Sequence, residues 1–134
     1  MEIKTNEATL NRPEGHRLLD APYVFADLSH FIKQLTEENA WDKSDRNAIT
    51  VFKSDNITIV LSALKTAAVI KDNTVNGFFT VQVLKGNIRM ETMEGITEMR
   101  EQQLITFHPD ILHSVEAITD TILLMTTYDV KKSD

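Results

Sequence analysis

The chain has 134 residues, which is the length of one domain and leaves no room for a second. Its 20 acidic residues outnumber its 14 Lys and Arg residues, and the formal net charge of −6 argues against binding to nucleic acid or to an anionic membrane, since both need a basic surface. The absence of cysteine excludes disulfides, thiolate metal sites and thiol nucleophiles, so any chemistry must come from histidines, carboxylates, hydroxyls and amides.

The N-terminal region, residues 1–20, is polar and mixed in charge, and Pro13 and Gly15 interrupt any periodicity. This pattern predicts an arm that becomes ordered only by lying on another surface, followed by a single domain over residues 21–134. The sequence contains no apolar stretch of the length that a signal peptide or a membrane-spanning helix needs. We therefore expect a cytoplasmic location.

One short amphipathic helix is predicted after an apolar patch at residues 23–25. Apolar residues recur there at helical spacing, and Ser29 is available as the N-cap. The apolar residues of this helix are Leu28, Phe31, Ile32 and Leu35. Beyond Trp41 the sequence shows no helical period, so we expect no further helix.

The rest of the chain is predicted to form strands, because β-branched residues are dense and turn sequences recur at intervals of about 8 to 12 residues. The predicted strands are 48–52, 57–64, 67–70, 78–84, 88–92, 96–99, 104–107, 113–118 and 121–128. This spacing is typical of an antiparallel sandwich or barrel. Period-two alternation places Phe79, Val81 and Val83 on the interior face, and it places Ile88 and Met90 there as well.

Two stretches carry a family resemblance. The first is TVQVLKG at residues 80–86, and the second is HPDILHSVEA at residues 108–117. With the strands around them, they resemble the cupin superfamily, specifically its small single-domain members. The resemblance implies an all-β fold, an antiparallel double-stranded β-helix or jelly-roll barrel with one short N-terminal helix. It places Gly86 at a tight hairpin turn closing the first motif, and it aligns the Pro-x-Gly-x-x-His pattern of the second motif with residues 108–113.

The resemblance also implies where a metal would be bound. Catalytic cupins hold a divalent metal with a His-x-His pair and a glutamate from the first motif and a histidine from the second, since a metal inside a barrel needs several inward donors that reach one point. Counting back from Gly86, the glutamate position falls on Phe79, and the histidine positions fall on Asp72 with Thr74 or on Asn73 with Val75. Only His113 remains a strong donor. No cofactor is therefore expected, and a divalent metal, if one binds, would use His113 with Asp72 or Asn73.

The first functional hypothesis is a cupin-like protein that binds a small organic ligand in the open end of the barrel without a complete metal centre. His113 is the candidate catalytic residue, as a general base in a reaction of the isomerase type. Without catalysis, the same pocket would serve a sensor or a carrier. The predicted ligand-binding residues are Asn73, Phe79, Val81, Ile88, Met90, Phe107, His108 and His113.

Two further hypotheses remain open. One is a metal-dependent cupin enzyme, a dioxygenase, isomerase or lyase that acts on a small carbonyl or sugar substrate. The other is a structural dimeric module whose barrel is filled by Phe79, Met90 and Phe107. A site that joins His108 to His113 is less favoured, because a turn separates them and their rings need not converge. We expect a homodimer, formed through the N-terminal arm and the apolar strands at 48–52 and 57–64.

Overall fold

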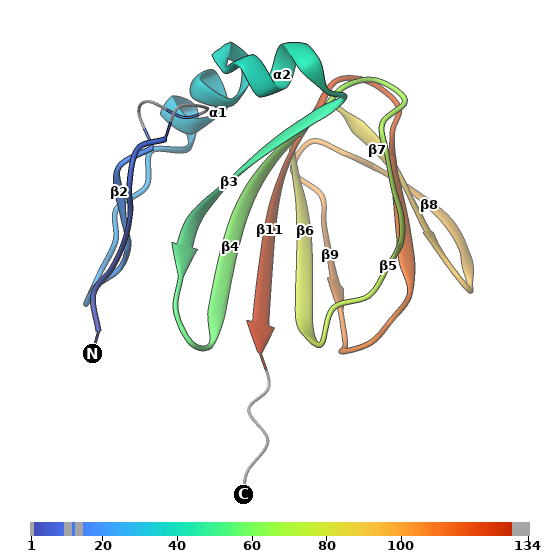
Figure 1. The fold of residues 1–134 in the computed structure, drawn as a ribbon. Helices are drawn as coiled ribbons and strands as arrows, with labels where there is room; N and C mark the ends of the chain where they lie inside the picture. Colours follow the sequence, from blue (N-terminus) through green and yellow to red (C-terminus); the bar gives the residue numbers. More distant parts are fainter. Residues whose placement is uncertain (1, 10–11, 13–14, 130–134) are drawn as a thin grey trace, which may run out of the picture.

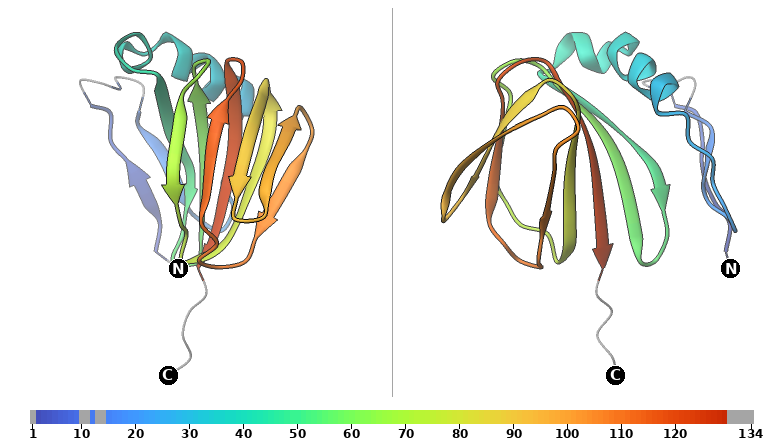
Figure 2. Two further views of the ribbon diagram at one scale, coloured as in Figure 1. Left: turned by 90° about the vertical axis from the view of Figure 1, so that its right-hand side faces the viewer. Right: turned by 180° about the vertical axis from the view of Figure 1, so that it is seen from behind.

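The structure is a computed structural model that describes residues 2–9, 12 and 15–129. Within these residues, two antiparallel sheets face each other, and a separate hairpin lies near the N-terminus (Figure 1). The helices lie beside the larger sheet, on the side that faces away from the smaller one (Figure 2). No helix in the described ranges has the length and apolar character that a membrane crossing requires. The predicted all-β fold with facing sheets is confirmed.

The described N-terminal elements are β1 (Lys4–Asn6), β2 (Arg17–Asp20), α1 (Leu28–Glu37) and α2 (Asn39–Lys43). The larger sheet has the order β3-β4-β11-β6-β9, formed by β3 (Arg46–Lys53), β4 (Ile57–Leu64), β11 (Thr121–Asp129), β6 (Gly77–Lys85) and β9 (Leu104–Phe107). The smaller sheet has the order β5-β10-β7-β8, formed by β5 (Val69–Asn73), β10 (His113–Ala117), β7 (Asn87–Thr92) and β8 (Gly95–Arg100). Every strand range predicted from the sequence overlaps one of the strands β3 to β11.

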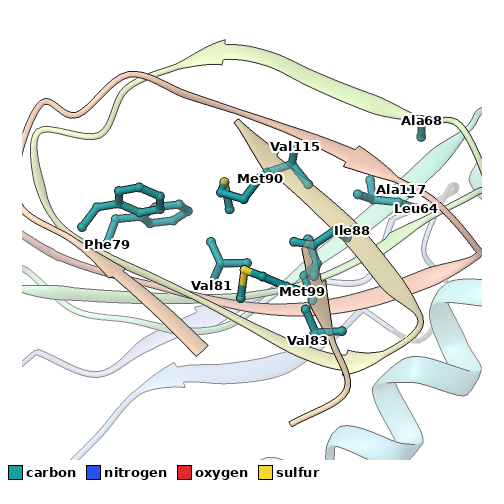
Figure 3. Close-up of a cluster of buried hydrophobic side chains, with 12 residues drawn as sticks. Leu64, Ala68, Phe79, Val81, Val83, Ile88, Met90, Met99, Val115 and Ala117 are labelled. Atoms are coloured by element: carbon teal, nitrogen blue, oxygen red, sulfur yellow. The ribbon is translucent and has the colours of Figure 1, made fainter. Parts of the chain in front are cut away.

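The barrel interior is filled by the side chains that the alternation placed inward. Phe79, Val81 and Val83 on β6 are buried, and so are Ile88 and Met90 on β7. Figure 3 shows these side chains meeting between the two sheets in one cluster. Removing so much apolar surface from water is the main force that holds the two sheets together. The prediction that these residues face the interior is confirmed.

A second apolar cluster lies between the helices and the outer face of the larger sheet. Leu35 of α1 belongs to it, together with Ile49 of β3, Leu61 of β4 and Ile122 of β11, and all of these side chains are buried. The strands at 48–52 and 57–64, which were expected to form a homodimer face, are therefore covered on this side by helices of the same chain. The oligomeric state itself stays a prediction.

The N-terminal part differs from the prediction in three details. The Asp27 carboxylate accepts a hydrogen bond from the backbone N–H of His30, so Asp27 and not Ser29 is the N-cap of α1. The second helix, α2, was not expected, because a single turn and a half is too short to show a period in the sequence. The arm contains the antiparallel hairpin β1–β2, and Pro13, which was expected to interrupt any periodicity of the N-terminal region, lies outside the described residues.

A largely buried ion pair fixes the arm on the helices. The guanidinium of Arg12 donates to both carboxylate oxygens of Glu38, with Nε–Oε2 and Nη2–Oε1 distances of 2.9 Å. Glu38 also accepts hydrogen bonds from the side-chain amides of Gln34 and Asn47. Although burial alone raises the pKa of the Glu38 carboxyl, these hydrogen bonds lower it overall. The arm therefore lies on the domain through a charge-assisted contact.

Replacing Arg12 by alanine is expected to lower the free energy of unfolding by about 2 kcal/mol at pH 7, because it leaves a poorly exposed carboxylate without its cation. A carboxyl whose pKa is lowered by folding stabilises the fold above its unfolded-state pKa, and this contribution is lost as the pH falls through the folded-state value. The loss in the variant should therefore shrink between pH 7 and pH 3 when urea unfolding is measured.

The matched control for this prediction is Arg46→Ala, which removes an ion pair with Asp45 whose partners are 42% and 52% exposed. This change should cost less than about 1 kcal/mol at either pH, since exposed ion pairs contribute little. An equal loss for Arg12→Ala at both pH values would contradict the stabilising role of the Glu38 carboxylate.

The chain crosses from the larger sheet to the smaller one at Gly86. β6 and β7 belong to different sheets, so Gly86 forms a corner and not the hairpin turn that the resemblance implied. That prediction is wrong because β7 pairs with β8 and β10 and forms no ladder with β6. The φ of Gly86 is +87°, a left-handed conformation that glycine adopts freely because it lacks a Cβ.

Candidate functional site

Three aromatic rings stack at one end of the barrel interior. Phe79 and Phe107 lie opposite each other on the paired strands β6 and β9. His113, the first residue of β10, comes from the facing sheet, and its ring centroid lies 4.8 Å from that of Phe107 and 5.3 Å from that of Phe79. The rings are tilted from the imidazole plane by 14° and 24°, respectively. We call Phe79, Phe107 and His113 the aromatic stack.

Both ring nitrogens of His113 have polar neighbours. Nδ1 lies 3.0 Å from the backbone carbonyl oxygen of Ile111, and because a carbonyl only accepts, Nδ1 carries a proton and donates it. Nε2 lies 3.4 Å from Nδ2 of Asn73, which donates to the remaining lone pair. Strand pairing brings these two residues together, since Asn73 is the register partner of His113 between β5 and β10. The imidazole is therefore satisfied by hydrogen bonds inside the protein.

The residues around His113 do not fit the metal that the resemblance associates with this position. The one nitrogen lone pair of the imidazole faces the Asn73 amide, and the Phe79 ring stands where a glutamate ligand would be needed. The two alternatives for a second donor are now separated: Asn73 lies beside His113, whereas Asp72 is exposed at a bulge with a φ of +50°. Among the described residues, no three histidine or carboxylate side chains are grouped as metal ligands would be.

The remaining predicted site residues are not gathered around an open space. Val81, Ile88 and Met90 are completely buried in the interior cluster. His108 is exposed, and its ring packs against Phe78 with 5.0 Å between centroids. Because neighbouring residues on a strand point to opposite faces, Phe78 lies on the opposite face of β6 from the aromatic stack. The rings of His108 and His113 therefore do not converge, as expected from the turn between them.

A cavity of about 660 Å³ lies at the open end of the barrel, and we call it the mouth cavity. It is bounded by the β7–β8 hairpin, by β9 and by the loop between β9 and β10. Its lining residues are Thr92, Met93, Glu94, Gly95, Ile96, Thr97, Ile105, Phe107, Asp110, Ile111 and Leu112. Most of the lining side chains are apolar, and Phe107 belongs both to this lining and to the aromatic stack.

Of the predicted ligand-binding residues, only Phe107 lines the mouth cavity. The sequence did contain a signal for some of the lining residues that were not predicted. Met93 lies in a turn, and Ile111 and Leu112 lie in a loop, where side chains are normally polar. Met93 is 93% exposed, and such apolar residues gathered at one place on a surface indicate a binding site. Period-two alternation could not find them because they lie outside or at the ends of the strands.

No protein-family model matches the sequence, and no curated protein matches it. Solved structures do match the fold. A cupin superfamily protein from Desulfitobacterium hafniense matches with a TM-score of 0.62 and 12% identity, over 63% of this chain and 78% of that chain. The chain has the cupin fold. An RmlC-like cupin from Desulfovibrio desulfuricans matches this cupin barrel with a TM-score of 0.59 and 20% identity, over 65% of this chain and 85% of that chain.

A third similar structure is that of KdgF from a Halomonas species, with a TM-score of 0.59 and 11% identity, over 66% of this chain and 82% of that chain. At such identities the likeness establishes the fold alone, because one fold carries many unrelated sites. The function of this cupin barrel must therefore be argued from its own cavity and side chains.

Proposed function

We propose that this cupin barrel binds a small, mainly apolar organic molecule in the mouth cavity. The observation that carries the proposal is the size and lining of the cavity. Its volume of about 660 Å³ falls in the range of ligand sites, and its walls include Ile96, Ile105, Phe107 and Leu112. Ile96 and Leu112 are exposed, so a ligand that covers them removes apolar surface from water.

The proposal keeps the ligand at the open end of the barrel, as predicted from the sequence, but gives it other lining residues. The lumen is filled by the interior cluster, which includes Phe79, Val81 and Met90. His113 is 3% exposed and does not line the mouth cavity. A ligand in the mouth cavity contacts Phe107, and His113 supports the site by packing against the Phe107 ring. Binding of the sensor or carrier type has more support than general-base catalysis by His113.

The test uses 2-phenylethanol as a neutral probe and follows the backbone amide signals of the labelled protein by NMR. We expect shifts confined to residues 92–97 and 105–112. Ile96→Asn should weaken binding about fivefold, because it replaces an exposed apolar wall by a polar one without disturbing the interior. Val69→Asn is the matched control, an exposed apolar residue on β5 outside the cavity, and it should leave the affinity unchanged.

Two outcomes contradict the proposal. One is a wild-type protein that shows no shifts at the cavity residues, and the other is an equal loss of affinity in both variants. The second candidate, a structural module with a filled barrel, is favoured by the buried Phe79, Met90 and Phe107, and it would be supported by the first of these outcomes.

The hypothesis of a metal-dependent enzyme has one strong donor, His113, in its favour. Homodimer formation and a cytoplasmic location stay predictions.

A further inference from the structure

We infer that the ligand of the mouth cavity carries a positive charge and is an organic ammonium whose apolar part fills the cavity. This inference rests on the proposed function and adds the charge class of the ligand. It follows from the carboxylates of the lining, from the absence of an ion-pair partner for them among the described residues and from the apolar walls beside them.

All charge in the described lining of the mouth cavity is negative. Glu94 and Asp110 contribute carboxylates, and the other lining residues are apolar, threonine or glycine. No lysine, arginine or histidine is among them. A ligand that enters therefore meets a negative potential, which favours a cation and opposes an anion.

Neither of these carboxylates forms an ion pair within the described part of the chain. Carboxylates elsewhere on the same sheet do so: Arg89 pairs with Glu98 at 3.6 Å and with Glu116 at 3.3 Å. Among the residues that the structure describes, no basic side chain thus neutralises the negative charges of Glu94 and Asp110 by an ion pair. A bound ammonium would supply the missing counter-charge.

The two carboxylates are carried by separate segments, and in each segment the backbone N–H of the acidic residue donates a hydrogen bond. The N–H of Glu94 donates to Oγ1 of Thr92 at 3.2 Å, in the turn between β7 and β8. The N–H of Asp110 donates to the carbonyl oxygen of Val75 at 2.9 Å, in the loop before β10. These hydrogen bonds fix the backbone that carries each carboxylate, which lowers the ordering cost when a ligand binds.

Phe107 adds an aromatic surface to the apolar walls of the mouth cavity. It is the aromatic member of the lining, and its ring is held in place by the aromatic stack. The carbon chain or aryl group of an organic ammonium can pack against this apolar surface. Apolar walls, an aromatic ring and two unpaired carboxylates together match an aryl-alkyl or alkyl ammonium better than a neutral or acidic molecule.

The experiment compares three probes that share one phenyl ring: phenethylammonium, 2-phenylethanol and 3-phenylpropionate. Affinities are measured by NMR titration at pH 7 and constant ionic strength. Phenethylammonium should bind about tenfold more tightly than 3-phenylpropionate, with 2-phenylethanol between them, because the contribution of each exposed carboxylate is modest. The preference should weaken in 0.5 M NaCl, since salt screens exposed charges.

The variants Glu94→Gln and Asp110→Asn remove the charges and keep the shapes. Asparagine also tolerates the left-handed conformation of Asp110, whose φ is +64°. The double variant should bind the three probes within about twofold of one another, while its affinity for 2-phenylethanol stays as in the wild type. Glu37→Gln, on the exposed side of α1, makes the same change in net charge as either single substitution but away from the cavity, and it should leave the preference intact.

The outcomes separate this inference from the proposed function. If the three probes bind the wild type equally, or if the double variant keeps the preference for phenethylammonium, the charge class is wrong and the binding site stands. If none of the probes shifts the cavity signals, both the inference and the proposed function are overturned.

Discussion

Replacing Gly86 by alanine is expected to lower the free energy of unfolding by about 3 kcal/mol. A left-handed conformation costs a residue with a Cβ about 1–2 kcal/mol, and Gly86 has a φ of +87°. An added Cβ would also come within 2.4 Å of the carbonyl oxygen of Asp120 and 2.6 Å of Oγ1 of Thr121. Because this single residue joins β6 to β7 across the sheets, the backbone has little freedom to relieve the clash. The clash therefore supplies the rest of the lost free energy of unfolding.

The control for this prediction is Gly95→Ala. Gly95 also has a positive φ, +132°, but no atom lies within 4 Å of where its Cβ would be. This variant isolates the backbone cost and should lose about 1 kcal/mol. Urea unfolding of both variants measures the difference. Equal unfolding midpoints for the two variants would show that the clash of an added Cβ with Asp120 and Thr121 does not contribute to the loss at Gly86.

Replacing Phe107 by alanine is expected to lower the free energy of unfolding by about 4 kcal/mol, because truncating a buried phenylalanine leaves a void that the surrounding core fills only in part. Phe107 is 7% exposed, and its ring contacts both Phe79 and His113. The same change removes the aromatic wall of the mouth cavity. Stability is measured by urea unfolding, with the midpoint and the slope reported separately.

Two further variants make the Phe107 prediction specific. Leu104→Ala changes a residue of the same strand that is 59% exposed, and it should cost less than about 1 kcal/mol. Phe107→Leu keeps an apolar side chain, so it should fold with a smaller loss and bind 2-phenylethanol more weakly than the wild type. A Phe107→Ala variant as stable as Leu104→Ala would mean that the aromatic stack contributes no packing energy.

His113, at the position where the sequence resemblance implied a metal ligand, packs as part of the core. Asp110, which the sequence resemblance aligned with a glycine, has a positive φ of +64°, a conformation that glycine adopts freely. His113 accordingly points into the barrel, as the resemblance implied. Its neighbours there are two phenyl rings, a backbone carbonyl and an amide, which satisfy the imidazole without any further donor atoms.

The strands and their interior faces could be predicted because they depend on local pattern. Alternation along β6 and β7 identified Phe79, Val81 and Met90 as interior residues, and their burial confirms it. A side chain's face in a strand follows from its position alone, so no knowledge of the partner strand is needed. The N-cap of α1 and the helix α2 were missed because capping and single helical turns depend on contacts that leave no periodic trace.

The candidate site was harder to predict, because it is formed by segments that meet only in the folded chain. Alternation separated inward from outward residues, but it could not distinguish a filled lumen from an open one, because the same inward residues would line an open lumen or fill a closed one. Asn73 was one of two alternatives until the pairing of β5 with β10 placed it beside His113. The mouth cavity depends on how the β7–β8 hairpin and the β9–β10 loop approach each other.

The order of apolar and turn residues was enough to predict an antiparallel sandwich or barrel and its inward-facing side chains, because both depend on neighbouring positions along the chain. The packed lumen, the partners of His113 and the place where Glu94 and Asp110 line one cavity depended on long-range strand pairing and loop packing. Such contacts join residues far apart in sequence, and their geometry follows from side-chain volumes on both sheets at once.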